Sequence, residues 1–148
     1  SLPETVECEC LPGGMNLVKR EVYEKVGLQD ESLFMYCDEN EFFLRVGAAG
    51  YRIIATSKAL SSHCHINIAG KQRNGGLAWF YINRNQLILC RNYSTIFDTL
   101  YLFIQRFFYY GVKLSVTFLL EKRPSKIYYY YLGLVLGILN YQKNTLKK

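Results

Sequence analysis

The sequence lacks a long uninterrupted apolar run, although half of its 148 residues are hydrophobic. A helix that spans a bilayer needs about 20 mostly apolar residues. The run 127–139 is too short for that, and the longer stretch 96–120 is broken by polar side chains at Asp98, Gln105, Arg106 and Lys113. These patterns argue against a spanning helix and favour amphipathic helices that lie in a membrane interface, with helices packed on their own domain as the alternative.

Paired cysteines are lacking as well, because the chain has five, an odd number, and no disulfide-scaffold pattern. No signal-peptide pattern opens the sequence, so we expect reduced thiols in a cytosolic setting. Most of the cysteines are expected to be small buried side chains. The sequence also has no initiator Met before Ser1 and no glycine-rich phosphate loop. We therefore expect a piece of a longer protein that does not bind a nucleotide well by itself.

Charge is distributed unevenly along the chain. Residues 1–70 hold six Lys/Arg against ten Asp/Glu, a net of −4, whereas residues 71–148 hold twelve against two, a net of +10. Much of the aromatic content, which includes 13 Tyr and 9 Phe, also lies in the second half. This asymmetry predicts a site-bearing part over 1–76 and a helical, basic part over 77–148 that meets an anionic surface.

Periodicity and turn residues predict the elements. Strand-like alternation covers 4–10 and 51–56, and residues 15–19 read as a strand or as the entry to a helix. Gly27 and Gly50 are expected to end two helices of the first part, over 20–26 and 38–49. Residues 57–67 and 70–76 read as polar loops. The second part is predicted to contain three helices, over 77–91, 96–120 with an interruption at Gly111, and 126–141.

An acidic cluster at the start of the helix over 38–49 carries the strongest functional pattern. The stretch 27–52, GLQDESLFMYCDENEFFLRVGAAGYR, resembles the acidic box of the family 2 glycosyltransferases. Further matches follow the family's order. The first is Gly13-Gly14-Met15, which is followed by Lys19-Arg20. The second is the segment Ala59 to His63, in which His63 lies 24 residues after Glu39. The third is the predicted helix that contains Tyr81, Arg84, Asn85 and Leu87. The resemblance covers roughly residues 10–95.

The resemblance implies an α/β fold, the C-terminal half of a GT-A domain followed by amphipathic helices. It implies transfer of a sugar, with inversion, from a nucleotide diphosphate sugar to a glycan or lipid-linked acceptor in cell-surface polysaccharide synthesis. Glu39 is the expected catalytic base, with Asp38 as the alternative. Substrate contacts are expected from Gly13, Gly14, Met15, Glu41, Arg45 and Arg84. His63 is expected to ligate Mg²⁺ or Mn²⁺, shared with an N-terminal half whose Asp-x-Asp motif is absent from these 148 residues.

Elementary chemistry agrees with these roles but leaves alternatives open. A positioned carboxylate can take the acceptor hydroxyl's proton, yet acids in a first helical turn also occur as a solvated, dipole-stabilising turn. Glu41 and Arg45, four residues apart, also fit a structural ion pair.

A non-catalytic membrane-surface module remains the main alternative function. Cys8-x-Cys10 and His63-Cys64-His65 are too tightly spaced for common zinc sites, and the basic residues form no nucleic-acid motif. We expect a cytoplasmic protein, peripheral on the inner face of the plasma membrane.

Overall fold

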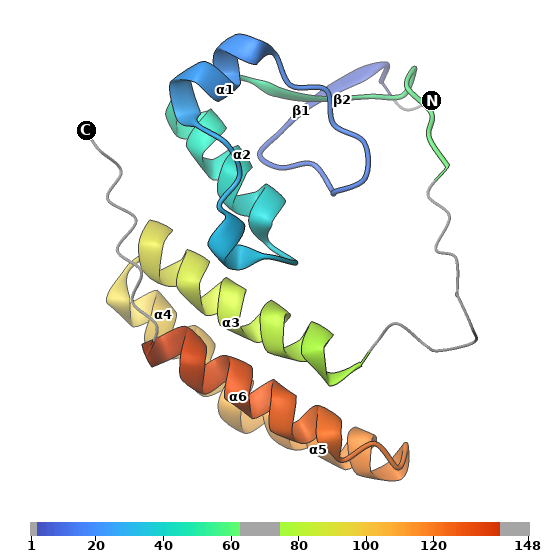
Figure 1. The fold of residues 1–148 in the computed structure, drawn as a ribbon, viewed down its shortest axis with the longest axis vertical. Helices are drawn as coiled ribbons and strands as arrows, with labels where there is room; N and C mark the ends of the chain where they lie inside the picture. The colour runs from blue at the N-terminus through green and yellow to red at the C-terminus, as the bar shows by residue number, and fades with distance from the viewer. Residues whose placement is uncertain (1–2, 63–74, 140–148) are drawn as a thin grey trace. The chain divides into compact units, whose positions relative to one another are not determined.

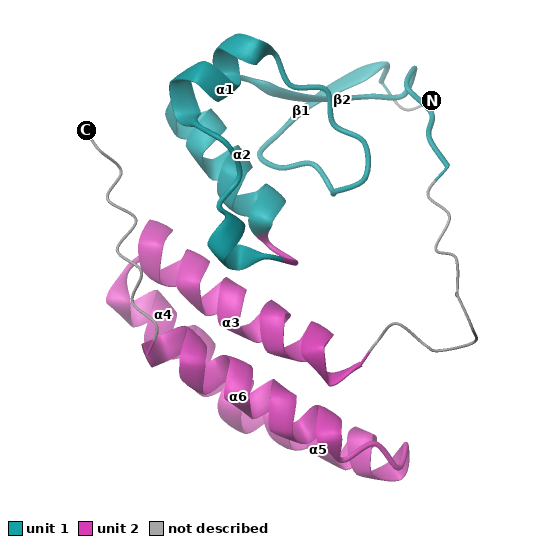
Figure 2. Cartoon of the chain, in the orientation of Figure 1, with its two compact units in different colours: residues 1–34, 38–68 teal, residues 35–37, 69–148 magenta. Residues whose placement is uncertain are grey.

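The computed structural model describes residues 3–62 and 75–139 of the chain. Two compact units are present (Figure 2): unit 1 comprises residues 1–34 and 38–68, and unit 2 comprises residues 35–37 and 69–148. The described part is mostly helical and contains one small two-stranded sheet (Figure 1). The expected α/β class is confirmed to that coarse extent, and membership of a GT-A domain stays a prediction.

Unit 1 places a two-stranded sheet against two helices. Strands β1 (Thr5–Cys8) and β2 (Ile53–Thr56) pair in antiparallel register, with Thr5 opposite Thr56 and Cys8 opposite Ile53. Helix α1 (Arg20–Val26), the 3-10 turn η1 (Glu31–Leu33) and helix α2 (Asp38–Ala48) lie between the strands in sequence. A two-stranded sheet is marginal in water by itself. It is stabilised by a core formed by Val22, Phe42, Phe43, Val46 and Ile53.

The helices and strands of unit 1 lie largely where turn residues and periodicity predict them. Helix α1 matches the predicted range and ends at Gly27, whose φ of +81° suits glycine and whose N–H donates to the Tyr23 carbonyl. Helix α2 and both strands lie within their predicted ranges, and wherever an end differs from the prediction the element is shorter there by one or two residues. Residues 15–19 form no strand and lead directly into α1, with Lys19 at its N-cap.

Unit 2 consists of helices. Helix α3 (Gly76–Tyr93) precedes α4 (Ile96–Ile104), the π-helical segment η3 (Gln105–Tyr110) and α5 (Gly111–Leu120), and these last three follow without a break. Helix α6 (Ser125–Leu139) returns along α3 and α5 (Figure 1). The core contains Leu87, Phe118, Tyr130 and Leu134. Within residues 75–139 and 3–62, no helix is long and apolar enough to cross a membrane.

The predicted interruption at Gly111 is wrong in its position. Gly111 has helical dihedrals, φ −61° and ψ −46°, and the irregular segment is the π-helix that precedes it. The Tyr130 hydroxyl donates to the Arg106 carbonyl in this segment at 2.9 Å, so α6 stabilises the π geometry. A Cβ on Gly111 would lie 2.6 Å from the Tyr131 hydroxyl oxygen. It would also lie 2.9 Å from the Arg106 carbonyl oxygen, a backbone atom that cannot move as easily as the tyrosine, so glycine suits this position for a reason that sequence periodicity does not reveal.

Close packing of α6 on α3 gives a first testable expectation. A Cβ on Gly133 would overlap the carbonyl oxygen of Phe80, and one on Gly137 would lie 2.9 Å from that of Arg84. Overpacking costs about 1–3 kcal/mol, which exceeds the roughly 1 kcal/mol of helix propensity that alanine gains over glycine. We expect Gly133→Ala to lower the free energy of unfolding, by up to about 2 kcal/mol, in urea denaturation.

A matched control lies in α2. A Cβ on Gly47 would meet nothing within 4 Å, so Gly47→Ala should be stabilising by up to about 1 kcal/mol. Effects of the same sign for the two substitutions would contradict the close α3–α6 contact.

Candidate active site

The acidic first turn of α2 forms the centre of the candidate site. It contains Asp38, Glu39 and Glu41. The Glu39 carboxyl group lies against Gly13, which belongs to the loop between β1 and α1, so closely that a Cβ on Gly13 would overlap Glu39 Oε1. The structure thus brings together two residues that the sequence assigned separately, to catalysis and to the acceptor side.

Electrostatics distinguish Glu39 from an ordinary surface acid. Burial raises the pKa of Glu39, and the charge of Asp38 and a hydrogen bond between the two carboxyl groups raise it further. A hydrogen bond from the Glu39 backbone N–H acts in the opposite direction without cancelling the rise. A carboxylate that holds its proton more tightly than usual is a stronger base once it is ionised. The arrangement therefore suits proton abstraction from a hydroxyl group.

A cysteine next to Glu39 is a neighbour that sequence reasoning missed. The Cys10 thiol donates to Asn40 Oδ1 at 3.5 Å. Burial raises the pKa of Cys10, as does the charge of Glu39 and, to a smaller extent, that of Cys8. Cys10 is exposed, and the other described cysteines, all free, are half-buried: Cys8, Cys37 and Cys90. The expectation that the cysteines are buried is therefore wrong for the part of the chain described here. Cys8 packs at the edge of the unit 1 core, Cys37 immediately precedes α2 and Cys90 lies near the end of α3, and each keeps part of its side chain in solvent.

The backbone immediately before α2 is strained. Phe34, Tyr36 and Cys37 have φ values of +60°, +65° and +64°. Such left-handed conformations of non-glycine residues cost of the order of 1 kcal/mol or more each and cluster at functional sites. In residues 3–62 and 75–139 the only other non-glycine residue with positive φ is Lys122, at the turn before α6. The strain therefore marks the segment that leads into the acidic turn.

Glu41 and Arg45 form a buried ion pair. Arg45 Nε and Nη2 each donate to a Glu41 carboxylate oxygen at 2.8 Å, and the exposed fractions of the two side chains are 13 % for Arg45 and 2 % for Glu41. Arg45 also donates to the carbonyl oxygens of Val26, the last residue of α1, and of Leu28, which lies just beyond the helix. The pair thereby fastens α2 to the end of α1. This geometry favours the structural interpretation over the predicted substrate contact.

The remaining predicted site residues are distributed over both units. Gly14 follows Gly13 with φ +126°, and Met15 is exposed in the same loop. Arg84 belongs to α3 in unit 2, where its guanidinium carbon lies 5.7 Å from the ring centre of Tyr81 and 6.0 Å from that of Phe80. His63 lies outside the described residues.

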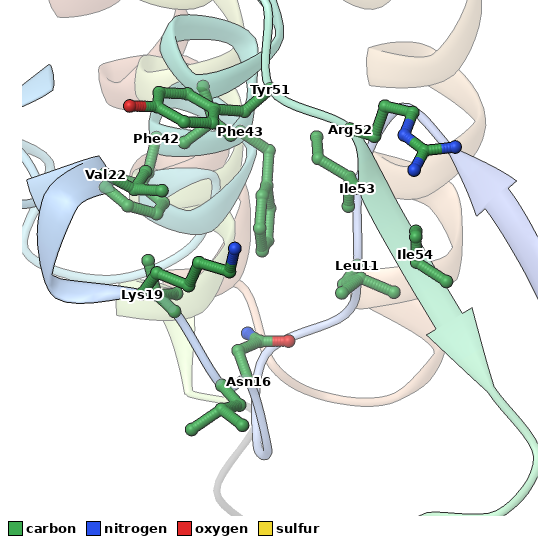
Figure 3. Close-up of a pocket in the computed structure, with 13 residues that line it drawn as sticks. Leu11, Asn16, Lys19, Val22, Phe42, Phe43, Tyr51, Arg52, Ile53 and Ile54 are labelled. Carbon is green, nitrogen blue, oxygen red and sulfur yellow. The ribbon is translucent and has the colours of Figure 1, made fainter. Parts of the chain in front are cut away.

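A pocket of about 360 Å³ opens in unit 1 beside the same loop. Its lining comes from the loop, α1, α2 and β2 (Figure 3) and includes Leu11, Phe43 and Ile53. Exposed Lys19 and Arg52 also line it, and Lys19 forms a solvent-exposed pair with Glu21, which is not part of the lining. An apolar group that carries an anion is the chemistry that such a pocket accommodates. The sequence had not indicated the pocket, because its lining is made by residues from four separate elements.

The expected divalent metal ion finds no set of ligands in residues 3–62 and 75–139. No group of three or more His, Cys, Asp or Glu side chains in that part of the chain could hold one. Comparison with protein-family models, with curated proteins and with solved structures found no match to the chain.

Proposed function

We propose that the chain forms the acceptor-side part of a glycosyltransferase, with Glu39 as the catalytic base. The contact between Glu39 and Gly13 is the observation that carries this proposal. It places a carboxylate of raised pKa next to an exposed, glycine-containing loop on which a hydroxyl-bearing substrate could lie. The strained backbone before α2 supports it, since functional segments often hold such conformations.

The proposed reaction joins an acceptor hydroxyl oxygen to the anomeric carbon of a nucleotide diphosphate sugar. As the new C–O bond forms, the bond to the diphosphate oxygen breaks and the nucleoside diphosphate leaves. Glu39 takes the hydroxyl proton, and attack from the face opposite the leaving group inverts the anomeric centre. Burial, together with the neighbouring Asp38, keeps the pKa of Glu39 high. Gly13, Gly14 and Met15 would contact the acceptor, and Arg84 would contact the diphosphate.

The proposal also includes a nucleotide-sugar-binding half and a divalent metal ion, and both rest on the family resemblance of the sequence. A divalent ion, Mg²⁺ or Mn²⁺, would neutralise charge on the diphosphate, with His63 as this chain's candidate ligand. The acceptor is a glycan or a lipid-linked sugar, and the apolar pocket with Lys19 and Arg52 favours the lipid-linked form. Such an enzyme would act in cell-surface polysaccharide synthesis, peripheral on the cytoplasmic face of the plasma membrane.

A transfer assay tests the proposal. The complete product of the gene is incubated with uridine, guanosine and thymidine diphosphate sugars and with membrane extract as the source of acceptor. We expect release of nucleoside diphosphate from one donor that depends on the extract. A folded protein that releases nothing from any donor would contradict the proposal. That result would favour the second candidate, a non-catalytic membrane-surface module, which the exposed apolar side chains of α4 and α5 support.

A further inference from the structure

The helix that runs through α4, η3 and α5 has an unusual solvent-exposed side. Large apolar and aromatic side chains are exposed along it at intervals of three or four residues, at Tyr101, Ile104, Phe108, Val112, Val116 and Leu120. We call these six residues the α4–α5 face. The solvent side of a helix in a globular protein is normally polar, and a contiguous exposed apolar patch marks an interaction site.

The opposite side of this helix already has partners within unit 2. Phe118 is buried, and Phe103, Phe107 and Leu114 pack on the core that includes Tyr130 and Leu134 of α6. The α4–α5 face is therefore not an incomplete part of this core. The helix is about 37 Å long, which gives a narrow, extended apolar surface.

The charged side chains near the α4–α5 face are mainly positive. The charged residues of the helix are Asp98, which is held in the N-terminal capping box, Arg106, which donates to Asn83, and Lys113, which is exposed. Lys122 and Arg123 are exposed just beyond the end of α5, whereas Glu121 there is neutralised by Lys126 at 2.9 Å. Residues 75–139 hold seven Lys/Arg against two acids.

We propose that the α4–α5 face is a membrane-binding surface that lies in the interface of an anionic phospholipid layer. Aromatic rings and aliphatic side chains would enter the boundary between headgroups and acyl chains, with the tyrosine hydroxyls toward water. Lys113, Lys122 and Arg123 would contact lipid phosphates. A second copy of the chain fits less well, because the exposed side of the helix carries three cations against one acid, Asp98, whose carboxylate already accepts hydrogen bonds from Ser94 and Thr95. This inference rests on the proposed function in one respect: that proposal includes a peripheral membrane location, and the α4–α5 face is the surface that would make the contact.

Vesicle flotation of the full chain tests the surface without any nucleotide sugar, so failure here leaves the transfer reaction untouched. The probes are phosphatidylcholine vesicles with and without phosphatidylglycerol. Binding should be tighter to the anionic vesicles and should weaken, without disappearing, as salt rises, because apolar burial is not screened. Binding that is absent, or that salt abolishes, would overturn the proposal.

Matched leucine variants show which surface binds. Leu120 is 80 % exposed on the α4–α5 face and Leu60 is 90 % exposed in unit 1. Leu120→Ser should weaken binding about tenfold, whereas Leu60→Ser should leave it unchanged. Lys122→Ser should weaken binding to anionic vesicles about fivefold. Equal effects of the two leucine variants would overturn the proposal. It would also be overturned if the parent chain did not bind vesicles and sedimentation velocity showed a dimer that Leu120→Ser abolishes.

Discussion

Replacement of Glu39 by Gln is expected to lower the turnover of the complete enzyme about 100-fold or more while leaving donor binding nearly intact. Glutamine keeps the shape of the side chain against Gly13 and removes the ability to accept a proton. The fold should not suffer, because the raised pKa of Glu39 shows that its ionised form is disfavoured in the folded state. Steady-state kinetics and urea denaturation of the same preparations measure both quantities. The exposed acid Glu24 of α1 provides a control, since Glu24→Gln should change neither.

The pH profile separates a base from a residue that only shapes the site. The ionised form of Glu39 is the active one, so the rate should fall as the pH decreases through its pKa, which lies above that of an ordinary glutamate. Because Asp38 contributes to this rise, Asp38→Asn should move the acid limb of the profile to lower pH. Near-normal turnover in Glu39→Gln would exclude Glu39 as the base, whereas an unchanged acid limb in Asp38→Asn would show that burial alone raises the pKa of Glu39.

Gly13 offers a complementary variant. In Gly13→Ala the new methyl group would overlap the Glu39 carboxyl group, which ends a flexible side chain and can move at little cost in stability. Turnover should therefore fall although the free energy of unfolding changes little. Full activity in Gly13→Ala would show that the contact between the two residues does not position the carboxylate for catalysis.

Replacement of Glu41 by Gln is expected to lower the free energy of unfolding by about 3–5 kcal/mol, because it leaves the buried Arg45 guanidinium without its carboxylate. The guanidinium also holds the carbonyl oxygens of Val26 and Leu28, so the junction between α1 and α2 should loosen with it. Urea denaturation followed by circular dichroism measures the loss.

The control for this variant is the exposed pair Lys19–Glu21, whose atoms lie 3.6 Å apart with most of both side chains in solvent. Glu21→Gln should change stability by less than about 1 kcal/mol. A Glu41→Gln variant that is as stable as the parent but binds substrate more weakly would restore the predicted substrate contact and contradict the structural interpretation.

Much of the local structure could be predicted because its causes are local. Glycine at the end of α1, acids in the first turn of α2 and apolar periodicity in α3 place these helices to within a few residues. The spacing of Glu41 and Arg45 likewise indicates their ion pair. The π-helical segment is different. Its Arg106 carbonyl accepts a hydrogen bond from the Tyr130 hydroxyl, which is 24 residues away in sequence, so the local pattern does not predict this contact.

The candidate site was predictable in its residues and not in its contacts. The resemblance selected Gly13 and Glu39 individually, but their contact depends on how the loop before α1 folds over α2. The position of Cys10 beside Glu39 depends on the path of the same loop, and no sequence pattern predicts it.

Asn83 and Asn85, both fully buried, were also not recognised as structural, because amides in a helix are usually exposed. Asn83 donates to the Tyr130 carbonyl, and Asn85 donates to the Met35 and Tyr36 carbonyls.

The pairing of β1 with β2 has a consequence for the order in which unit 1 acquires its structure. Cys8 and Ile53 are partners although 44 residues separate them, whereas α1 and α2 are near neighbours in the chain. Closing a long loop costs entropy before the strand contacts are gained, and non-local pairing slows folding. During synthesis β1 must therefore wait, unpaired, until β2 has left the ribosome. The contacts among Val22, Phe42 and Phe43 can form earlier and provide the surface on which the sheet then assembles.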